Sequence, residues 1–346
     1  MMAELEVLNC TYCEEPQQGA QRVILPIIMV LIAAVGITGN SLVLFIILGH
    51  RDMRTVTNSF VASLALTDIA ILVICVIPTA VVYVTNTWKL GEFLCRAASY
   101  TQAVTVQATC FTLTAMTVDR YYLIVHAVRS RNTRTVTKAV IINVFIWIVS
   151  SLIHLASFIY VHLTEDGTCK SDFPNAQVSD KVYGLFSFLG MYIVPLICIM
   201  FCYTQILIQI WRKTSGGTES AQAHTRALRR KRKITRMVFI VVVLFAFCWA
   251  PIQIFTVWSR FSLSDSDESK DLTVVQNLKV SFVCIAYANS CVNPFVYAFT
   301  TTSFRKYFRK MFATCCRSPY KERTSISISM TTKTERLPPG EEDSSI

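Results

Sequence analysis

Seven long runs of apolar residues divide the chain, and short polar or charged segments separate one run from the next. Each run exceeds the roughly 20 mostly apolar residues that a helix needs to cross a bilayer. The ten-residue alternation of apolar and polar residues that is typical of membrane β-barrels does not repeat along the chain. The pattern therefore predicts an all-α membrane protein, a seven-transmembrane helix bundle. The runs are Val23–Leu48, Ser59–Tyr83, Phe93–Val125, Ala139–Val161, Val182–Trp211, Met237–Trp258 and Val274–Phe299.

The third run differs from the other six, because serine, threonine and glutamine recur throughout it. Such residues are typical of helix–helix interfaces inside a membrane, where their side chains hydrogen-bond to neighbouring helices. We therefore expect the third helix to be surrounded by other helices and to have little contact with lipid.

Composition supports the membrane class. Charged residues make up 16% of the chain, against about 25% in a typical soluble domain, and the mean hydropathy is +0.46. These values exclude a soluble globule and a chain that is mainly disordered. Most of the 13 cysteines lie singly inside apolar runs, where a cysteine acts as a small buried hydrophobe. Zinc spacing is absent, because the pair Cys10 and Cys13 stands alone, and whether these two form a disulfide is left open.

Basic residues outnumber acidic residues by 33 to 22, which gives a net charge of +11. With the N-terminus placed outside, eight basic residues lie on the outer side and the other 25 on the cytosolic side. Because basic residues concentrate in cytoplasmic segments, this predicts a multi-pass protein of the plasma membrane with an extracellular N-terminus and a cytoplasmic C-terminus. The same split explains the net charge without nucleic acid, and it indicates contacts with anionic membrane lipid and an intracellular partner.

The two ends of the chain carry modification signals. Residues 1–22 form an extracellular tail without the apolar core of a signal peptide, and they contain a glycosylation sequon at Asn9. Residues 23–300 are the predicted bundle. Residues 301–316 alternate basic and aromatic residues, which predicts a short amphipathic helix on the inner leaflet. Cys315 and Cys316 follow it as palmitoylation sites or as two unmodified thiols. Residues 317–346 are rich in serine and threonine, which predicts a disordered cytoplasmic tail.

Few ionisable residues lie at membrane depth, where they are expensive and often functional. Asp68 lies inside the second run, and Asp119 and Arg120 end the third. A carboxylate such as Asp68 needs a cation, a proton or several hydrogen-bond donors in this environment. The buried asparagines of the first and seventh runs could instead serve helix packing alone.

Each of the seven runs contains one distinctive motif of polar, aromatic or proline residues. Together they resemble the motifs of rhodopsin-like G-protein-coupled receptors, and the resemblance covers about residues 20–316. The motifs are Gly39-Asn40, Leu64-Ala65-Leu66-Thr67-Asp68, Asp119-Arg120-Tyr121, Trp147, Pro195 with Tyr203, Cys248-Trp249-Ala250-Pro251 and Asn293-Pro294-Phe295-Val296-Tyr297.

Four further segments narrow the resemblance to kisspeptin receptors, whose near relatives are galanin and allatostatin-A receptors. The segments are Met53–Asn58, Gln107–Cys110, Leu113–Met116 and Pro251–Gln253. The kisspeptin type implies a receptor for an amidated neuropeptide that activates a heterotrimeric Gq protein, phospholipase C and calcium signalling. The galanin or allatostatin-A type would imply Gi. Family members usually have a proline nine residues after Trp147. Here that residue is Ala156, so we expect a straighter outer end of the fourth helix.

The resemblance assigns roles to residues in the bundle. Asp119, Arg120 and Tyr121 would couple the receptor to its G protein. The activation switch would consist of Trp249, Phe245, Pro251, Tyr203 and Tyr297. A sodium pocket would consist of Asp68, Thr109, Asn289, Ser290 and Asn293, and the alternative is a protonated Asp68 without an ion. We expect no metal and no cofactor other than this structural sodium. In many family members an acid near the base of the sixth helix holds the arginine of the third. Here that position is Lys231, so we expect signalling without ligand.

The resembled fold also implies one disulfide. Cys95 lies 25 residues before Arg120, about 37 Å along a helix, which puts Cys95 at the outer membrane face. Cys169 is the only cysteine between the fourth and fifth runs. On an oxidising outer face, the resemblance implies that Cys95 pairs with Cys169 and holds this loop over the mouth of the binding site.

The resemblance also indicates the ligand. Aminergic receptors have an aspartate where this chain has Gln102, and a neutral glutamine offers a donor and an acceptor that suit a carboxamide. The outer segments carry 13 acidic and eight basic residues, which would attract a cationic peptide or simply keep the surface soluble. We therefore expect an amidated peptide. The predicted ligand-binding residues are Gln102, Tyr83, Tyr183, Gln253, Lys279 and Tyr287.

Other classes fit less well. An ion-coupled transporter with Asp68 as carrier is a remote alternative, because the chain lacks the inverted repeats typical of transporters. An enzyme is not expected, since no nucleophile–base pair or metal set is visible. An opsin is excluded, because the seventh run has only Lys279 before Asn293, near its outer end. Further expected partners are arrestin and receptor kinases at the serine- and threonine-rich tail.

Overall fold

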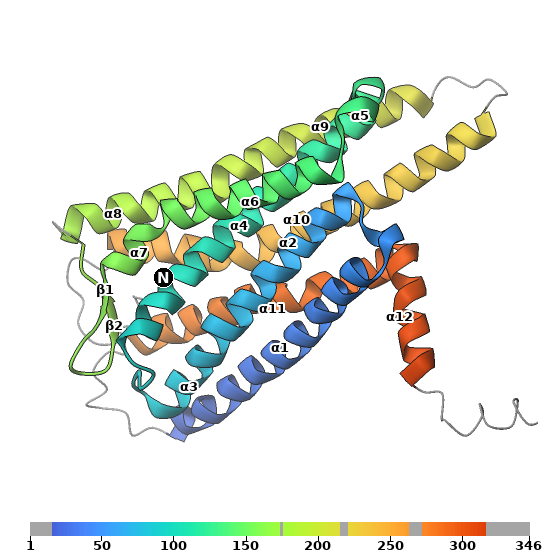
Figure 1. The fold of residues 1–346 in the computed structure, drawn as a ribbon. Coiled ribbons are helices and arrows are strands. Elements are labelled where there is room, and N and C mark those ends of the chain that lie inside the picture. Colours follow the sequence, from blue (N-terminus) through green and yellow to red (C-terminus); the bar gives the residue numbers. More distant parts are fainter. Residues whose placement is uncertain (1–15, 174–175, 215–220, 263–271, 316–346) are drawn as a thin grey trace, which may run out of the picture. The chain divides into compact units, whose positions relative to one another are not determined.

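The computed structural model describes residues 16–173, 176–214, 221–262 and 272–315. It divides into two units, Met1–Thr301 and Thr302–Ile346, each described here by itself. The first unit is almost entirely helical (Figure 1). Its helices are α1 (Pro16–Gly49), α2 (Val56–Ile71), α3 (Ile77–Thr85), α4 (Glu92–Val125), α5 (Ala127–Thr133), α6 (Val136–Ile153), α7 (Leu155–Ile159), α8 (Ala176–Phe186), α9 (Val194–Thr214), α10 (Ala221–Ser262) and α11 (Leu272–Thr300).

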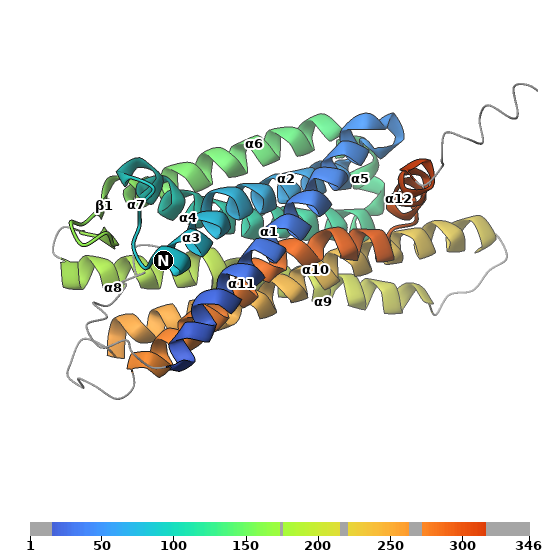
Figure 2. The same cartoon turned by 90° about the horizontal axis from the view of Figure 1, so that it is seen from below.

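Two of the membrane helices consist of two α-helices joined by a π-helical turn. Leu72–Val76 joins α2 to α3, and Ser187–Ile193 joins α8 to α9. With the pair α6–α7, these joined helices and the single helices α1, α4, α10 and α11 make seven rods in the described part of the unit. The rods run side by side in both views (Figures 1 and 2). The predicted seven-helix membrane bundle is confirmed.

Helix α4 lies at the centre of this bundle. It packs against α2, α6, α9 and α10, as its serine, threonine and glutamine content predicts. Within the described residues, six helical segments are apolar and long enough to cross a membrane, and α4 is not among them. Its 34 residues nevertheless extend about 51 Å, which exceeds the thickness of the hydrocarbon core. The central helix is therefore less apolar because its neighbours, not lipid, surround it.

Several helices extend beyond the apolar runs. Helix α1 begins at Pro16, inside the segment predicted as a tail, and α10 begins at Ala221, well before the predicted start at Met237. A proline is favourable in the first helical turn because its fixed φ suits the helix. Alanine, arginine and lysine are strong helix formers, so α10 continues through the basic segment. Hydropathy marks the part of a helix inside the membrane and not its ends.

The outer end of the fourth rod is interrupted. Helix α6 ends at Ile153, and His154 (φ −97°, ψ 8°) separates it from the short helix α7. The expectation of a straighter helix at this end is therefore wrong. The fourth apolar run also ends in a strand rather than a helix, because Val161 begins β1 (Val161–Leu163). A strand of three residues is too short for its alternation to be recognised in the sequence.

Strands β1 and β2 (Cys169–Ser171) pair antiparallel as a hairpin, with Val161 opposite Ser171. The predicted disulfide between Cys95 and Cys169 is confirmed, and it fixes β2 to the first turn of α4. At the tip, Gly167 accepts a hydrogen bond of 2.8 Å from the backbone N–H of Trp88. Gly167 has φ +76°, and a Cβ there would lie 3.0 Å from the Thr87 side chain. Because Cys169 pairs with Leu163 next to the turn, the hairpin is thus attached to its surroundings at two points of its turn end.

The second unit contains one described helix, α12 (Thr302–Cys315). Phe304 and Phe308 lie one helical turn apart with ring centroids 6.3 Å from each other, as the expected apolar face requires. Cys315 is the last residue of this helix. Asn9, Cys10, Cys13, Cys316 and the tail 317–346 lie outside the described residues, so their predicted modifications and partners stay predictions.

Candidate functional site

A cavity of about 770 Å³, here called the outer cavity, lies among α4, the α8–α9 rod, α10 and the hairpin. Three of the predicted ligand-binding residues line it, namely Gln102, Tyr183 and Gln253. Every described residue of its lining is uncharged, and valine, methionine and phenylalanine form much of the wall. A largely apolar cavity with a few polar groups is the usual form of a ligand site.

Three polar side chains of the cavity have unused hydrogen-bonding atoms. Within the described part of the chain, Gln102 Oε1, Ser99 Oγ and Ser187 Oγ are buried and have no hydrogen-bond partner. Gln102 is only 3% exposed. A buried polar atom without a partner costs free energy, so the cavity is suited to a ligand that supplies matching donors and acceptors.

Tyr183 forms a wall of the cavity and does not offer a free hydroxyl. Its Oη lies 2.6 Å from Ser157 Oγ and 3.0 Å from His154 Nδ1. Its ring packs against Phe173, with centroids 5.2 Å apart. His154 is the residue that interrupts the fourth rod, and its hydrogen bond to the hydroxyl helps to position the Tyr183 side chain. Tyr183 therefore presents its ring to a ligand.

The other three predicted ligand-binding residues are not part of this lining. Tyr287 on α11 is buried beside Thr79 and Tyr83 of α3. Lys279 lies further toward the start of α11 and is partly exposed. The structure does not bring these three residues to the cavity, and their contact with a ligand stays a prediction.

A second cavity of about 200 Å³ lies deeper, and Val106 lines both cavities. Asp68, Thr109, Asn289 and Ser290 line it, as the predicted sodium pocket requires, together with Trp249. Asn293 is adjacent, because its Nδ2 donates a hydrogen bond of 2.9 Å to Asp68 Oδ2. The five predicted residues are therefore brought together around one carboxylate.

Neighbouring polar residues fix this cluster. Asn40 Nδ2 donates to the carbonyls of Gly36 and Ser290, both at 2.9 Å, and so ties α1 to α11. Thr109 donates to Thr67 Oγ1 at 3.0 Å. Among the described residues, Asn289 Oδ1 is buried without a hydrogen-bond partner. One unused amide oxygen thus lies in a cavity that also contains a carboxylate and hydroxyls.

The predicted switch residues lie deeper in the bundle than the outer cavity, at and toward the end that is predicted to face the cytoplasm. Phe245 and Trp249 are buried on α10 with ring centroids 6.1 Å apart, and Pro251 lies inside the same helix. Tyr297 is fully buried on α11, and Tyr203 Oη lies 3.5 Å from the Thr235 carbonyl. Their role in activation stays a prediction.

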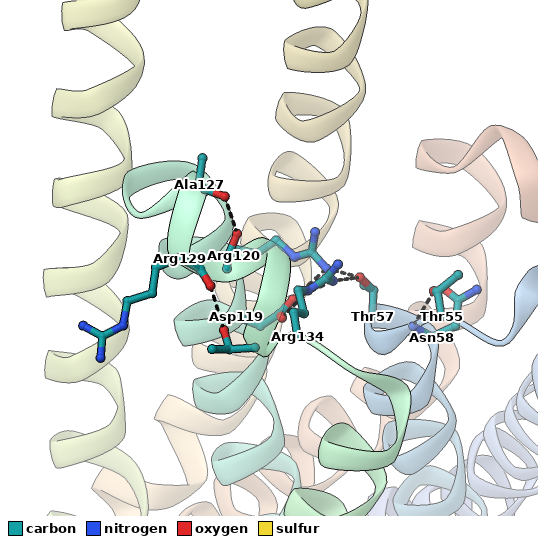
Figure 3. A network of polar contacts seen from close by, with 10 residues as sticks. Thr55, Thr57, Asn58, Asp119, Arg120, Ala127, Arg129 and Arg134 are labelled. Carbon is teal, nitrogen blue, oxygen red and sulfur yellow. Dashed lines mark hydrogen bonds and ion pairs between the residues drawn. The ribbon is translucent and has the colours of Figure 1, made fainter.

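Asp119, Arg120 and Arg134 form a charged cluster near the C-terminal end of α4, which the charge pattern predicts to face the cytoplasm (Figure 3). Arg120 is almost fully buried. Its Nη2 lies 3.0 Å from Asp119 Oδ2 and also donates to Thr57 Oγ1. Tyr121 lies apart from this cluster, with its Oη 3.2 Å from His126 Nε2. The side chain of Lys231 lies outside the described residues.

No site role was assigned from the sequence to Ser99, Thr67 or Arg134, although Thr67 belongs to the motif that ends at Asp68. Ser99 lies three residues before Gln102 on one helix, so helical spacing could have found it. Thr67 directly precedes Asp68, and nothing in its position alone distinguishes it from a packing residue. Arg134 belongs to a basic segment between α5 and α6, where the sequence does not show which residue reaches Asp119.

The fold is a seven-helix membrane bundle with a ligand-sized cavity near the start of α4 and a buried Asp-Arg cluster near the end of α4, an arrangement that suits a membrane receptor. A family model described as 7 transmembrane receptor (rhodopsin family) matches residues 39–297. The chain belongs to this family of G-protein-coupled receptors, which is not enzymatic.

Three similar proteins are receptors by name. G-protein coupled receptor 54 of Oreochromis niloticus is 36% identical over 90% of this chain and 84% of its own length. The KiSS-1 receptor of Rattus norvegicus is 35% identical over 87% of this chain and 76% of its own length. Galanin receptor type 1 of the same species is 32% identical over 89% of both chains.

Proposed function

We propose that this receptor is activated by an amidated neuropeptide of the kisspeptin type. The observation that carries the proposal is the uncharged outer cavity in which the buried Gln102 Oε1 has no hydrogen-bond partner among the described residues. A terminal carboxamide would donate to this oxygen. A terminal carboxylate could not donate to it, and among the described lining residues it would meet no cation, so burying its charge would be costly.

The comparisons favour the kisspeptin type over its relatives. Identity to the KiSS-1 receptor is 35%, against 32% for galanin receptor type 1 and for the Allatostatin-A receptor of Bombyx mori. The difference is small, so galanin- and allatostatin-A-type ligands belong in the same test. Membership of this receptor family argues against the alternative of an ion-coupled transporter.

The proposed signalling follows from this type. The receptor would lie in the plasma membrane with its N-terminus outside, where the acidic outer segments attract a basic peptide. It would activate a Gq protein and release calcium. Arrestin and receptor kinases would act on the cytoplasmic tail, and anionic lipid would contact the basic loops.

The peptide and G-protein proposals can be tested together. Cells expressing the receptor are treated with an amidated peptide ending in Arg-Phe, its free-acid form, galanin and an amidated peptide ending in Phe-Gly-Leu. Calcium and cyclic AMP are measured. We expect calcium release with the first peptide only. A cyclic AMP decrease with galanin or with the Phe-Gly-Leu peptide would instead assign the receptor to those relatives and to Gi.

We also propose that the deeper cavity holds a structural sodium ion. The donor set fits, because a carboxylate with neutral oxygens suits a hard cation, and Asn289 Oδ1 is buried there without a partner among the described residues. Asp68, Thr109, Asn289 and Ser290 would hold the ion, and Asn293 would orient the carboxylate. An ion that binds one packing of the helices better than the other shifts the receptor toward that packing.

Asp68→Asn is expected to make agonist affinity insensitive to sodium. The variant keeps the shape of the side chain and removes its charge, so a cation loses its main ligand. The measurement is displacement of labelled agonist in sodium chloride against N-methylglucamine chloride at equal ionic strength. Ser63→Ala is the control, since Ser63 lies on the same helix and its Oγ accepts from Trp147 instead. Sodium sensitivity that survives in Asp68→Asn would place the ion elsewhere.

A further inference from the structure

Arg134 holds Asp119 more completely than Arg120 does. Arg134 Nε donates to Asp119 Oδ1 at 2.6 Å and its Nη2 donates to Oδ2 at 2.9 Å, so it uses both carboxylate oxygens. Paired contacts of this kind are the strong form of an arginine–carboxylate interaction. Arg120 reaches only Oδ2, at 3.0 Å. Arg120, although it is adjacent to Asp119 in the sequence, therefore makes the weaker interaction with the Asp119 carboxylate.

The two arginines also share a second acceptor. Thr57 Oγ1 accepts from Arg134 Nη2 at 3.1 Å and from Arg120 Nη2 (Figure 3). Arg120 Nε is buried and has no hydrogen-bond partner among the described residues. Arg120 is thus incompletely paired, whereas Arg134 satisfies Asp119 and also reaches Thr57.

The burial of these groups determines the cost of separating them. The side chain of Asp119 is 11% exposed and that of Arg120 is 1% exposed, whereas Arg134 is 26% exposed. Removing the partner of a buried charge is strongly destabilising. If Arg120 left Asp119 to meet a G protein, the carboxylate would be left without a counter-charge unless a second cation stayed with it.

We propose that Arg134 is the positioning residue that stays with Asp119 and so lowers the cost of releasing Arg120 to the G protein. It belongs to the loop that follows α5, and it would remain on Asp119 and Thr57 in both receptor states. Arg134 would therefore favour coupling and not restrain it. This inference depends on the family role of Arg120 and is independent of which peptide binds.

The test uses the full-length receptor in cell membranes, with Arg134→Gln at matched surface expression. The readout is the binding of GTPγS to added Gq heterotrimer, called uptake below. It is measured without peptide and with an amidated peptide ending in Arg-Phe. We expect uptake to fall about fivefold in Arg134→Gln, as a change of this size follows from a small difference in free energy. Arg134→Lys keeps the charge and loses the paired contact, so its uptake should be intermediate.

Two comparisons separate the proposed role from a general effect of charge or folding. Arg129→Gln removes one charge from α5, and the side chain of Arg129 points away from Asp119 in Figure 3, so its uptake should equal that of the native receptor. In an Asp119→Asn background, Arg134→Gln should have no further effect, because the carboxylate that it serves is gone.

Three results would overturn the proposal. They are raised or unchanged uptake in Arg134→Gln, an equal fall in the Asp119→Asn background, and a fall as large in Arg129→Gln. Raised uptake would show that Arg134 restrains the resting state. If the proposed peptide is wrong, only the stimulated measurement is lost, and uptake without peptide still decides the role of Arg134.

Discussion

Cys169→Ala is expected to abolish ligand binding and to reduce delivery of the receptor to the cell surface. The disulfide joins β2 to α4, and residues of the hairpin and its flank, Val161, Ser171 and Phe173, form part of the outer cavity. Loss of a native disulfide typically costs about 2–5 kcal/mol. Here the loss would also release one wall of the cavity.

The measurement is binding of labelled amidated peptide together with surface staining of an N-terminal epitope. Cys95→Ala should reproduce the result, and the double variant should be no worse than either single variant, because both remove the same bond. Cys284→Ala is the matched control, since Cys284 is a free cysteine on α11. Normal surface staining with unchanged affinity in Cys169→Ala would show that the disulfide does not support the site.

Gln102→Leu is expected to weaken an amidated agonist by about 1–3 kcal/mol, roughly 5- to 150-fold, because the carboxamide would lose its acceptor inside a buried site. The free-acid form of the same peptide should already be weak on the native receptor and should lose little further in the variant. Calcium release as a function of concentration gives both comparisons.

Gln107→Leu is the control for this substitution. Gln107 is a buried glutamine on the same helix and does not line the outer cavity, so this variant makes the same chemical change away from the ligand. Equal potency of the amide and free-acid peptides on the native receptor would show that Gln102 does not recognise the amide.

The sequence predicts the bundle well because the membrane imposes a simple rule. A membrane-spanning helix needs about 20 mostly apolar residues, and each such helix is therefore visible in the sequence as a long apolar run. A polar cluster around Asp68 was also predictable, because Asp68 is a lone carboxylate at membrane depth, and the sodium ion proposed there stays a prediction. The positions of Thr109 and Asn289 beside it came from the resemblance and not from the pattern of residues.

Other features depend on contacts that the sequence does not encode locally. The interruption at His154 occurs without a proline or glycine. The hairpin has strands of only three residues. Arg134 is one of several arginines in its loop, and only packing determines which of them reaches Asp119. Tyr183 was predicted as a ligand contact, but its hydroxyl is held by His154 and Ser157.

The double attachment of the hairpin has a kinetic consequence. The disulfide fixes the end of β2 that lies next to the turn, and the bond from Trp88 to Gly167 fixes the turn itself, so the turn end of the hairpin cannot swing across the entrance as one piece. A ligand would then enter without waiting for a lid to open. The observed rate of association should rise in proportion to ligand concentration, without the plateau that a slow opening step produces.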